Sequence, residues 1–366
     1  MLSPLPAGST IGILGGGQLG RMLAVAGAEL GFDVHIYEPE PDCPAGRVAA
    51  RVWTAAWDNS AALADFAKSV DVVTFEFENV PAESLAQIAA ITPIRPGVSS
   101  LELTQDRLVE KEFVTALGLL TAPFAAVADA NSLRAAHERL GPHGILKTRR
   151  FGYDGKGQMR ITRSEDVQTA CEALAQQDWI YEGFVDFACE VSVVLARDAQ
   201  GAMAAYDVTR NVHRAGILHT SSVPADLAPD LCGKALEQAQ RIGAALDHVG
   251  VLAVEFFVTR DGALIVNEIA PRVHNSGHWT QDGCAVSQFQ QHMRAVAGWP
   301  LGETGRLVAR AEMTNLIGDD VAAWQSLISQ PNALLHLYGK RDARAGRKMG
   351  HVNCVTPWAD GHNAGG

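Results

Sequence analysis

Two glutamates, Glu255 and Glu268, occupy a stretch whose residue pattern is that of a β-hairpin. The segment VLAVEFFVTRDGALIVNEIAPR is rich in Val, Ile, Leu and Phe, and its centre, Asp261-Gly262, is typical of a two-residue type I′ turn. If the loop consists of these two residues alone, the register places the glutamates directly opposite each other, with Cβ atoms about 5 Å apart. Carboxylates at that distance repel unless a cation lies between them, and Mg²⁺ accepts one or two carboxylates together with water and phosphate oxygens. The hairpin therefore predicts a magnesium site. The alternatives are a glutamate at a solvated strand end and a register shifted by one residue.

Groups suited to a nucleotide precede the hairpin. Lys147 lies among apolar residues of the expected strand GILKT, where a lysine is uncommon without an anionic partner. The residues that follow, FGYDGKGQ at 151–158, include three glycines, and the amides of such a loop can close over phosphates. Further on, the crossing at residues 182–185 between two expected strands offers backbone groups to a purine, and Glu190 offers a carboxylate to ribose hydroxyls. An ordinary hairpin loop and a carboxylate at the rim of the protein are the alternatives.

The first strands indicate a second anion-binding turn. The strand TIGIL, the turn GGGQLG and a helix lead to the strand DVHIY, which ends at Glu38. Gly15, Gly17 and Gly20 fit GxGxxG, the pattern of NAD-binding proteins, but a glycine turn before a helix N-terminus suits any phosphate. The third strand ends in Glu76 and Glu78, at the sheet edge where open α/β folds bind ligands; exposed strand-end acids are the alternative.

Polar side chains gather again after the hairpin, in PRVHNSGHWT. His274 and His278 have a spacing that binds zinc on a helix, but the Asn-Ser-Gly between them disfavours a helix, so we expect a substrate loop. Near the C-terminus, a basic run that includes Lys340, Arg347 and Lys348 is unusual in an acidic chain, with a solvated loop as the alternative.

The composition bounds the kind of protein. The 366 residues are 47% hydrophobic and 19% charged, an ordinary globular composition in a chain too long for one simple core. A formal net charge of −11 argues against a nucleic-acid partner. The chain has six scattered cysteines without CxxC spacing, no signal-peptide pattern and no apolar run of about 18 residues, so we expect a soluble cytoplasmic protein.

The combination of these motifs resembles a known family. Lys147 with FGYDGKGQ, the 182–185 crossing, Glu190, Glu255 and Asn267-Glu268 resemble the ATP-grasp superfamily, in which two lobes clamp ATP and two acids on adjacent strands hold Mg²⁺. The segments GGGQLGRM, TFEFENV, EIAPRVHNSGHWT and GRKMGH more closely resemble the N5-carboxyaminoimidazole ribonucleotide synthetase family of purine biosynthesis.

The resemblance, which extends to about residue 352, implies a mixed α/β and α+β fold. Its parts would be a Rossmann-like (pre-ATP-grasp) domain at 1–103, an ATP-grasp domain at 104–298 and a small β-rich C-terminal domain with a tail at 299–366. A homodimer without nucleic-acid or membrane partners is also implied.

The resemblance implies a reaction as well. The family converts 5-aminoimidazole ribonucleotide, ATP and bicarbonate to the N5-carboxylated nucleotide, ADP and phosphate, and we expect carboxyphosphate as the intermediate. The implied ATP-binding positions are Arg107, Lys147, Gly152, Tyr153, Asp154, Gly155, Lys156, Gly157, Gln158, Glu182, Gly183, Phe184, Val185, Glu190, His213, Asn267 and Glu268. The implied ribonucleotide-binding positions are Gln18, Leu19, Glu76, Arg272, His274, Asn275, Ser276, His278, Lys340, Arg347 and Lys348. Glu255 and Glu268 would hold Mg²⁺, with Mn²⁺ as a substitute. The expected catalytic positions are Lys147, Tyr153, Asp154 and Arg272, with Asp154 as the base for the amine.

Two positions depart from the family pattern. Phe151 stands where the glycine loop usually has a glycine, and the residues after His351 extend past the usual end and have no expected role. Three other functions compete: another ATP-grasp carboxylate-amine ligase, an NAD-dependent dehydrogenase and a non-catalytic nucleotide sensor. The dehydrogenase hypothesis leaves the opposed glutamates and the second glycine loop without a function.

Overall fold

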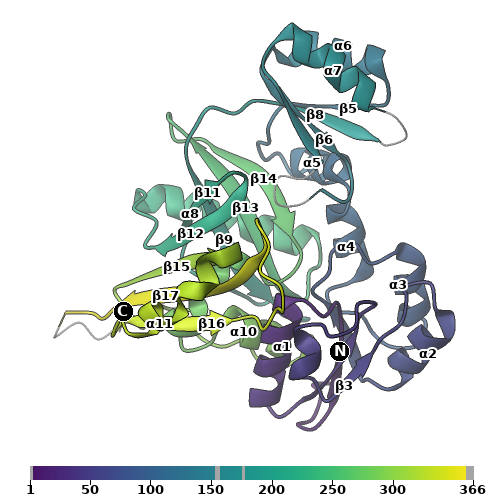
Figure 1. Ribbon diagram of the computed structural model, residues 1–366, viewed down its shortest axis with the longest axis vertical. Helices are drawn as coiled ribbons and strands as arrows, with labels where there is room; N and C mark the ends of the chain where they lie inside the picture. The colour runs from purple at the N-terminus through teal and green to yellow at the C-terminus, as the bar shows by residue number, and fades with distance from the viewer. Residues whose placement is uncertain (1–2, 153–156, 175–177, 360–366) are drawn as a thin grey trace.

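The computed structural model describes residues 3–152, 157–174 and 178–359. A small lobe projects at the top of Figure 1, and an N-terminal α/β region and a large sheet make up the rest.

The N-terminal region contains a parallel four-stranded sheet in the order β3-β2-β1-β4. Its strands are β1 (Thr10–Leu14), β2 (Asp33–Tyr37), β3 (Arg51–Trp53) and β4 (Val72–Phe75), and its helices are α1 (Gln18–Glu29), the 3₁₀ helix η1 (Ala45–Arg47), α2 (Ser60–Lys68), α3 (Ala82–Ala89) and α4 (Val98–Thr104). Strands β1 and β4 are almost entirely buried, as expected of parallel strands covered on both faces. The predicted βαβ unit is confirmed, and the carboxyl ends of β1 and β4 bring the glycine turn beside Glu76.

Helix α5 (Arg107–Ala116) leads into the small lobe, whose antiparallel sheet has the order β5-β8-β6-β7. Its strands are β5 (Phe124–Val127), β6 (Gly144–Thr148), β7 (Gln158–Ile161) and β8 (Trp179–Gly183). Helices α6 (Ala130–Leu140) and α7 (Ser164–Ala173) pack together and cover one face of this sheet (Figure 1). The predicted strand bearing Lys147 is confirmed as β6.

The other described strands form one nine-stranded antiparallel sheet in the order β14-β13-β9-β11-β12-β15-β17-β16, with β10 paired to β9. They are β9 (Phe187–Arg197), β10 (Met203–Ala205), β11 (Thr209–Arg214), β12 (Ile217–Val223), β13 (Gly250–Thr259), β14 (Leu264–Ala270), β15 (Arg310–Ile317), β16 (Ala333–Leu337) and β17 (Lys348–Thr356). The accompanying helices are α8 (Pro229–Ala245), η2 (Asn275–Gly277), α9 (Thr280–Gly283), α10 (Gln288–Ala297), η3 (Gly318–Ala323) and α11 (Trp324–Ile328). Because β12 hydrogen-bonds to β15, the C-terminal strands extend the same sheet that carries the hairpin.

The β13–β14 hairpin confirms the predicted pairing of the glutamates, but the predicted turn is wrong. Glu255 lies directly opposite Glu268. The loop consists of residues 260–262: the Gly262 N–H donates to the Thr259 carbonyl, and only Gly262 among these loop residues has a positive φ, of 83°. This longer loop shifts the register by one residue near the turn, and a β-bulge just after Glu255 shifts it back. The two effects cancel at the glutamates.

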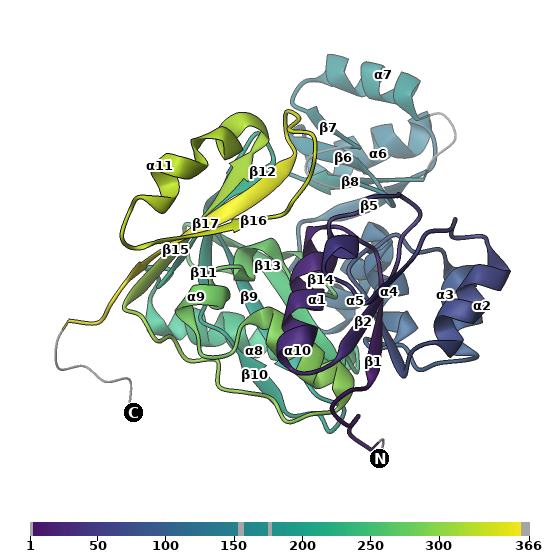
Figure 2. The same cartoon turned by 60° about the horizontal axis from the view of Figure 1, so that its bottom comes forward.

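Helix α10 fixes the N-terminal region against the large sheet. It packs on α1 and on strands β9 and β13 (Figure 2). A Cβ atom on Gly27 of α1 would lie 2.9 Å from the methyl group of Met293, so glycine permits this close approach of the helices. The side chains of Thr74 on β4 and His292 on α10 hydrogen-bond at 2.7 Å. The glycine turn is thereby held in a fixed position relative to the hairpin.

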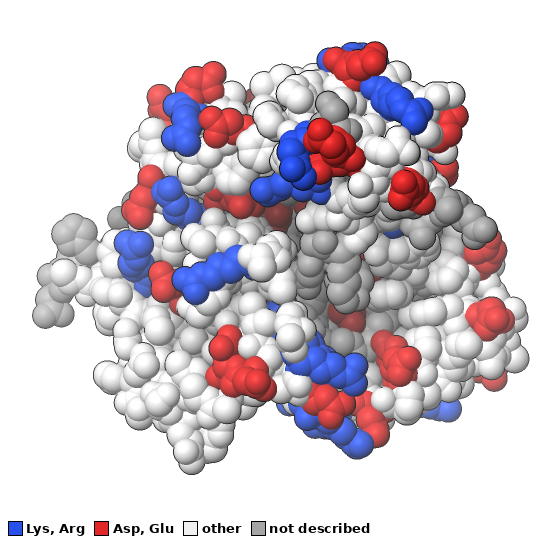
Figure 3. Space-filling view, turned by 45° about the horizontal axis from the view of Figure 1, so that its top comes forward, with Lys and Arg blue, Asp and Glu red and all other residues white. Residues whose placement is uncertain are grey.

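The described helices include none that is both long and apolar enough to cross a membrane. On the face drawn in Figure 3, basic and acidic side chains are interspersed.

Candidate active site

The two opposed glutamates form the centre of the candidate site. Burial, followed by the charge of Glu268, raises the pKa of Glu255 above its ordinary value. Burial acts in the same direction on Glu268, but the Arg107 guanidinium, with Nη1 3.4 Å from Glu268 Oε2, lowers the pKa of Glu268 overall. No group of three or more His, Cys, Asp or Glu side chains within the described residues could hold a metal ion. Two carboxylates with their remaining ligands taken from water and phosphate suit Mg²⁺, whereas a zinc site needs more side chains. The residues present therefore fit the predicted ion.

One buried carboxylate joins two lysines beside the hairpin. Glu182 Oε2 lies 2.8 Å from Lys147 Nζ, and Glu182 Oε1 lies 3.5 Å from Lys111 Nζ. Burial acts to raise the pKa of Glu182, but Lys111 and Lys147 together lower it to about 2. Lys111 Nζ also donates to Thr121 Oγ1 at 3.1 Å and to the Asn267 carbonyl at 3.4 Å, next to Glu268.

Lys111 was not among the predicted site residues. The sequence did contain a signal for it, since Lys111 lies three residues before Val114 on the buried side of α5. A lysine on the apolar side of a helix requires an anionic partner, but the sequence does not identify that partner.

The glycine-rich loop is described at its two ends. The Arg107 guanidinium donates to the Gly152 carbonyl at 3.2 Å, which places the start of the loop beside the hairpin. Gly157 has a φ of 70°, and a Cβ atom there would lie 2.6 Å from Thr148 Oγ1. Phe151 has a φ of 63°, so this phenylalanine adopts the left-handed conformation that the usual glycine would adopt more easily. Four predicted ATP-binding residues, Tyr153, Asp154, Gly155 and Lys156, lie outside the described residues, and Gln158 begins β7.

Several residues predicted to contact the adenosine already have partners within the protein. Glu190 Oε2 lies 2.8 Å from His213 Nδ1; burial lowers the pKa of His213, but this hydrogen bond and nearby glutamates raise it overall. The amides of Gly183 and Phe184 already donate to carbonyls of the same lobe at 2.7 and 3.0 Å. These two amides are therefore not available to a purine, and Glu182 lies within strand β8 rather than in the crossing.

Carboxylates fill the N-terminal glycine turn. The amide of Gly16 donates to Glu38 Oε2 at 2.7 Å, and the amide of Gly17 donates to Glu76 Oε1 at 2.6 Å. A Cβ atom on Gly16 would lie 2.5 Å from Cys43 Sγ. Burial raises the pKa of Glu76 to about 7. Because these side chains occupy the space of a dinucleotide pyrophosphate, the geometry disfavours the dehydrogenase hypothesis.

Some predicted ribonucleotide-binding residues lie around the hairpin and the glycine turn. Gln18 and Leu19 form the first turn of α1, where no side chain caps the helix. Arg272 Nη2 lies 2.9 Å from Glu78 Oε1, and His274 Nε2 lies 3.4 Å from Glu255 Oε1.

Three other predicted ribonucleotide-binding side chains are buried in the protein. Asn275 hydrogen-bonds to Asn315, Ser276 to Ser192, and His278 to Gln288. Ser276 and His278 are 0% exposed. In this structure these three side chains hold the shape of the loop and do not face an open site.

The basic run folds back toward the glycine turn. Lys340 Nζ donates to the Lys348 carbonyl at 2.7 Å, and Arg341 pairs with Asp42 of the N-terminal region at 3.0 Å. Burial has the largest effect on the pKa of Glu76 and on that of Glu255, and raises both. Among the smaller effects, the charge of Lys340 lowers the pKa of Glu76 and the charge of Lys348 lowers the pKa of Glu255. Arg347 is partly exposed and donates to a carbonyl of its own loop at 3.0 Å.

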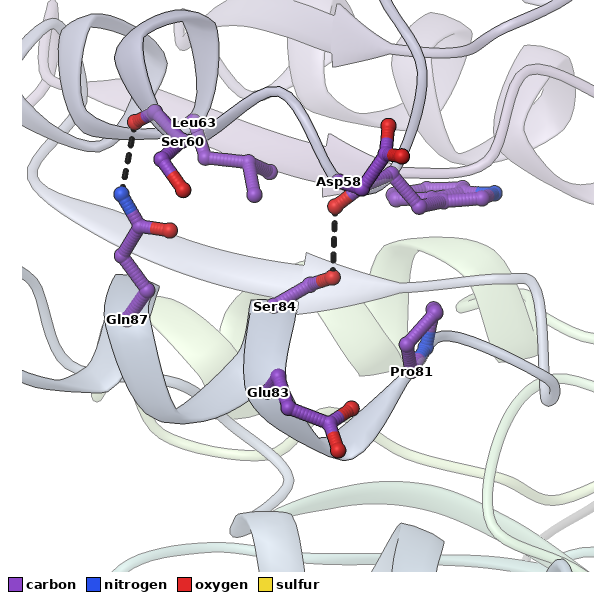
Figure 4. A pocket seen from close by; sticks show the side chains of 8 residues that line it. Asp58, Ser60, Leu63, Pro81, Glu83, Ser84 and Gln87 are labelled. Carbon is purple, nitrogen blue, oxygen red and sulfur yellow. Dashed lines mark hydrogen bonds between the residues drawn. The ribbon is translucent and has the colours of Figure 1, made fainter.

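A hollow of about 440 Å³ in the N-terminal region contains none of these groups (Figure 4). It is lined by Trp57, Asp58, Ser60, Leu63, Pro81, Glu83, Ser84 and Gln87. Ser84 donates to the Trp57 carbonyl at 2.7 Å and Gln87 to the Ser60 carbonyl at 2.6 Å. These bonds tie α3 to α2 and to the loop before it.

The fold and the site define an ATP-grasp ligase. The chain matches the ribonucleotide synthetase preATP-grasp domain over residues 8–105, the ATP-grasp domain over residues 112–289 and the phosphoribosylaminoimidazole carboxylase C-terminal domain over residues 311–361. The N5-carboxyaminoimidazole ribonucleotide synthase of Brucella melitensis is 51% identical over 356 residues, which are 96% of this chain and 98% of that protein. The chain belongs to the N5-carboxyaminoimidazole ribonucleotide synthase family.

Solved structures agree with this assignment. The N5-carboxyaminoimidazole synthetase of Staphylococcus aureus complexed with ADP is 37% identical, with a TM-score of 0.93 over 97% of this chain and 95% of that chain. The Aspergillus clavatus enzyme in complex with ADP and 5-aminoimidazole ribonucleotide is 31% identical, with a TM-score of 0.90 over 96% of this chain and 94% of that chain. The predictions of family and fold class are thereby confirmed.

Proposed function

We propose that the chain carboxylates 5-aminoimidazole ribonucleotide to N5-carboxyaminoimidazole ribonucleotide in de novo purine biosynthesis, consuming ATP and bicarbonate and releasing ADP and phosphate. The observation that carries this proposal is the opposed pair Glu255 and Glu268, which lies with Arg107 on one side and His274 of the polar loop on the other. Phosphate-binding and acceptor-binding groups thus meet at one hairpin.

The first step activates bicarbonate, which is a poor electrophile until ATP converts it to carboxyphosphate. Arg107, Lys147 and the amides of the glycine-rich loop bind the ATP phosphates and neutralise charge that develops on the transferred phosphoryl group. Glu255 and Glu268 would hold Mg²⁺, which would supply further positive charge for the phosphoryl transfer. Exclusion of water from the site protects the carboxyphosphate from hydrolysis.

In the second step the amine of the ribonucleotide attacks the carboxyl carbon of carboxyphosphate, which forms the C–N bond, breaks the C–O bond to phosphate and releases inorganic phosphate. The first amides of α1 at Gln18 and Leu19, with Lys340, Arg347 and Lys348, bind the phosphate of the ribonucleotide. Arg272 and His274 orient the imidazole, and Asp154 accepts the proton that the amine loses.

We further propose that the protein works in the cytoplasm as a homodimer and that Mn²⁺ can replace Mg²⁺. The scattered cysteines without CxxC spacing support a reducing compartment, and Mn²⁺ accepts the oxygen ligands that Mg²⁺ accepts. The homodimer follows from the family resemblance.

The decisive experiment is ADP release with and without 5-aminoimidazole ribonucleotide and bicarbonate. We expect release to depend on both. Equal release with glycine, with formate or without an acceptor would indicate a different ATP-grasp ligase. ATP binding without any acceptor-dependent release would indicate a nucleotide sensor.

A further inference from the structure

A chain of buried hydrogen bonds leads to the loop that carries His274. Ser221 Oγ donates to Asn211 Oδ1 at 2.8 Å, Asn211 Nδ2 to Ser192 Oγ at 3.0 Å, and Ser192 Oγ to Ser276 Oγ at 2.7 Å. Ser276 Oγ in turn lies 2.8 Å from His274 Nδ1. The two sheet serines and Ser276 are 0% exposed and Asn211 is 4% exposed, so these groups depend on one another for hydrogen bonds.

The chain belongs to the same part of the large sheet as the candidate metal site. Ser192, Asn211 and Ser221 come from the neighbouring strands β9, β11 and β12 (Figure 1). Asn211 lies directly opposite Ser221, and Ser192 lies directly opposite Glu255 on β13. Opposite residues of antiparallel strands project from the same face, so the chain extends the row that contains the glutamates.

The geometry fixes the direction of every bond in the chain. The backbone N–H of Ser276 donates to His274 Nδ1 at 3.3 Å, and because an amide can only donate, Nδ1 carries no proton. The Ser276 hydroxyl therefore donates to Nδ1 as well. Because the Ser276 hydroxyl has only one proton, its oxygen can only accept from the Ser192 hydroxyl. The Ser192 oxygen in turn accepts from the Asn211 Nδ2 group.

We propose that Ser192, Asn211, Ser221 and Ser276 form a directional relay that, together with the Ser276 amide, holds His274 as the neutral Nε2–H tautomer. With Nδ1 unprotonated, the single imidazole proton lies on Nε2, which is 3.4 Å from Glu255 Oε1. His274 therefore acts at the site as a hydrogen-bond donor and neither as a base nor as a metal ligand through Nε2. Two bonds between Gln288 and the backbone of His274, at 2.9 and 2.7 Å, hold the residue in place.

The inference rests on the proposed function for the roles of Glu255 and His274, but the tautomer itself does not depend on activity. Ser192, Asn211 and Ser221 are positioning residues, since they act on the site only through Ser276 and His274. If the Ser276 amide alone set the tautomer of His274, the tautomer ratio would not depend on Ser192.

The test is ¹⁵N NMR of the histidine-labelled protein without substrates, in which the shift of each imidazole nitrogen reports whether it is protonated. The His274 signals are assigned by their loss in His274→Gln. We expect wild-type protein to show a protonated Nε2 and an unprotonated Nδ1. A protonated Nδ1 in wild-type protein overturns the proposal whether or not any variant folds.

Ser192→Ala tests whether a residue that does not contact His274 affects its tautomer. Ser192→Ala no longer directs the Ser276 hydroxyl proton toward Nδ1, so one of the two donors to Nδ1 is weakened while the Ser276 amide remains. The tautomer ratio should therefore shift only in part toward Nδ1–H, by about fivefold, the equivalent of one buried hydrogen bond. Ser276→Ala should shift it in the same direction. The matched control is Ser222→Ala, which is next to Ser221 on β12 but on the opposite face, and it should leave the ratio unchanged.

Kinetics separate this inference from the proposed function. Ser192→Ala should lower kcat/KM for the ribonucleotide about three- to tenfold and leave KM for ATP unchanged. An unchanged tautomer ratio in both Ser192→Ala and Ser276→Ala overturns the relay. Absence of ribonucleotide-dependent ADP release in wild-type protein, with the expected tautomer present, overturns the proposed function and leaves the relay standing.

Discussion

Replacing Glu182 with glutamine removes the charge that two buried lysines share and keeps the volume of the side chain. Lys111 is 2% exposed, and its ammonium group would then lie inside the protein without a carboxylate partner. Removing one member of a buried ion pair costs about 3 to 5 kcal/mol, because the remaining charge stays desolvated. Independently, the pKa of Glu182, lowered from 4.5 to about 2, corresponds to about 3 kcal/mol of stability from its charged form. We therefore expect Glu182→Gln to lower the free energy of unfolding by about 3 kcal/mol.

The pH dependence of this loss has a defined sign. A carboxylate whose pKa is depressed on folding stabilises the protein above its unfolded pKa and ceases to do so as the pH falls through its folded pKa. The difference in stability between wild-type protein and Glu182→Gln should therefore be constant above about pH 4.5 and shrink as the pH falls toward about 2.

The assay is urea unfolding followed by circular dichroism and tryptophan fluorescence, with Trp179 on the same strand as Glu182. Glu138→Gln, on the exposed side of α6, is the matched control and should change stability by less than about 0.5 kcal/mol. Adding Lys111→Met to Glu182→Gln should restore part of the lost stability, since it removes the unpaired buried charge. The reasoning is refuted if Glu182→Gln behaves like Glu138→Gln, or if the second substitution lowers the stability further.

Three other outcomes test the site. Glu268→Gln should nearly abolish turnover with the fold intact, lowering kcat more than it raises KM for the ribonucleotide; near-normal activity at low Mg²⁺ would exclude the pair as ligands. Arg347→Ala or Lys348→Ala should raise KM for the ribonucleotide about ten- to a hundredfold, because each removes a charge-assisted contact to its phosphate. Steady-state kinetics should show KM for ATP nearly unchanged. An equal rise in both KM values would contradict the assignment. Burial and the charge of Glu268 raise the pKa of Glu255, so Mg²⁺ should displace a proton and bind more tightly as the pH rises through neutrality. Calorimetry in two buffers of different ionisation enthalpy measures that proton, and binding without its release would refute the raised pKa.

The sequence alone determined the features that depend on neighbouring residues. The alternation of apolar residues around Asp261-Gly262 specified the hairpin, and apolar runs specified the buried strands of the N-terminal sheet. The pairing of Glu255 with Glu268 was predicted correctly although the turn was not, because a bulge compensates for the longer loop. That bulge has no signature in the local sequence, since it depends on how β13 pairs with β9 as well as with β14. The family followed from several short motifs whose order is itself a property of the sequence.

Only the tertiary structure decided which side chains meet across long separations. Gly17 and Glu76 are 59 residues apart, and nothing in GxGxxG shows that the carboxylate directly after β4 occupies the turn. Ser276 and His278 read as ligand-binding groups because they are polar, yet β9 and α10 bury them and supply their partners. The sequence indicates that Lys111 needs an anionic partner, but only the structure shows that this partner is Glu182 of β8. Periodicity specifies which face of an element is buried. The hydrogen-bond partner of a buried polar group depends instead on how the elements pack together.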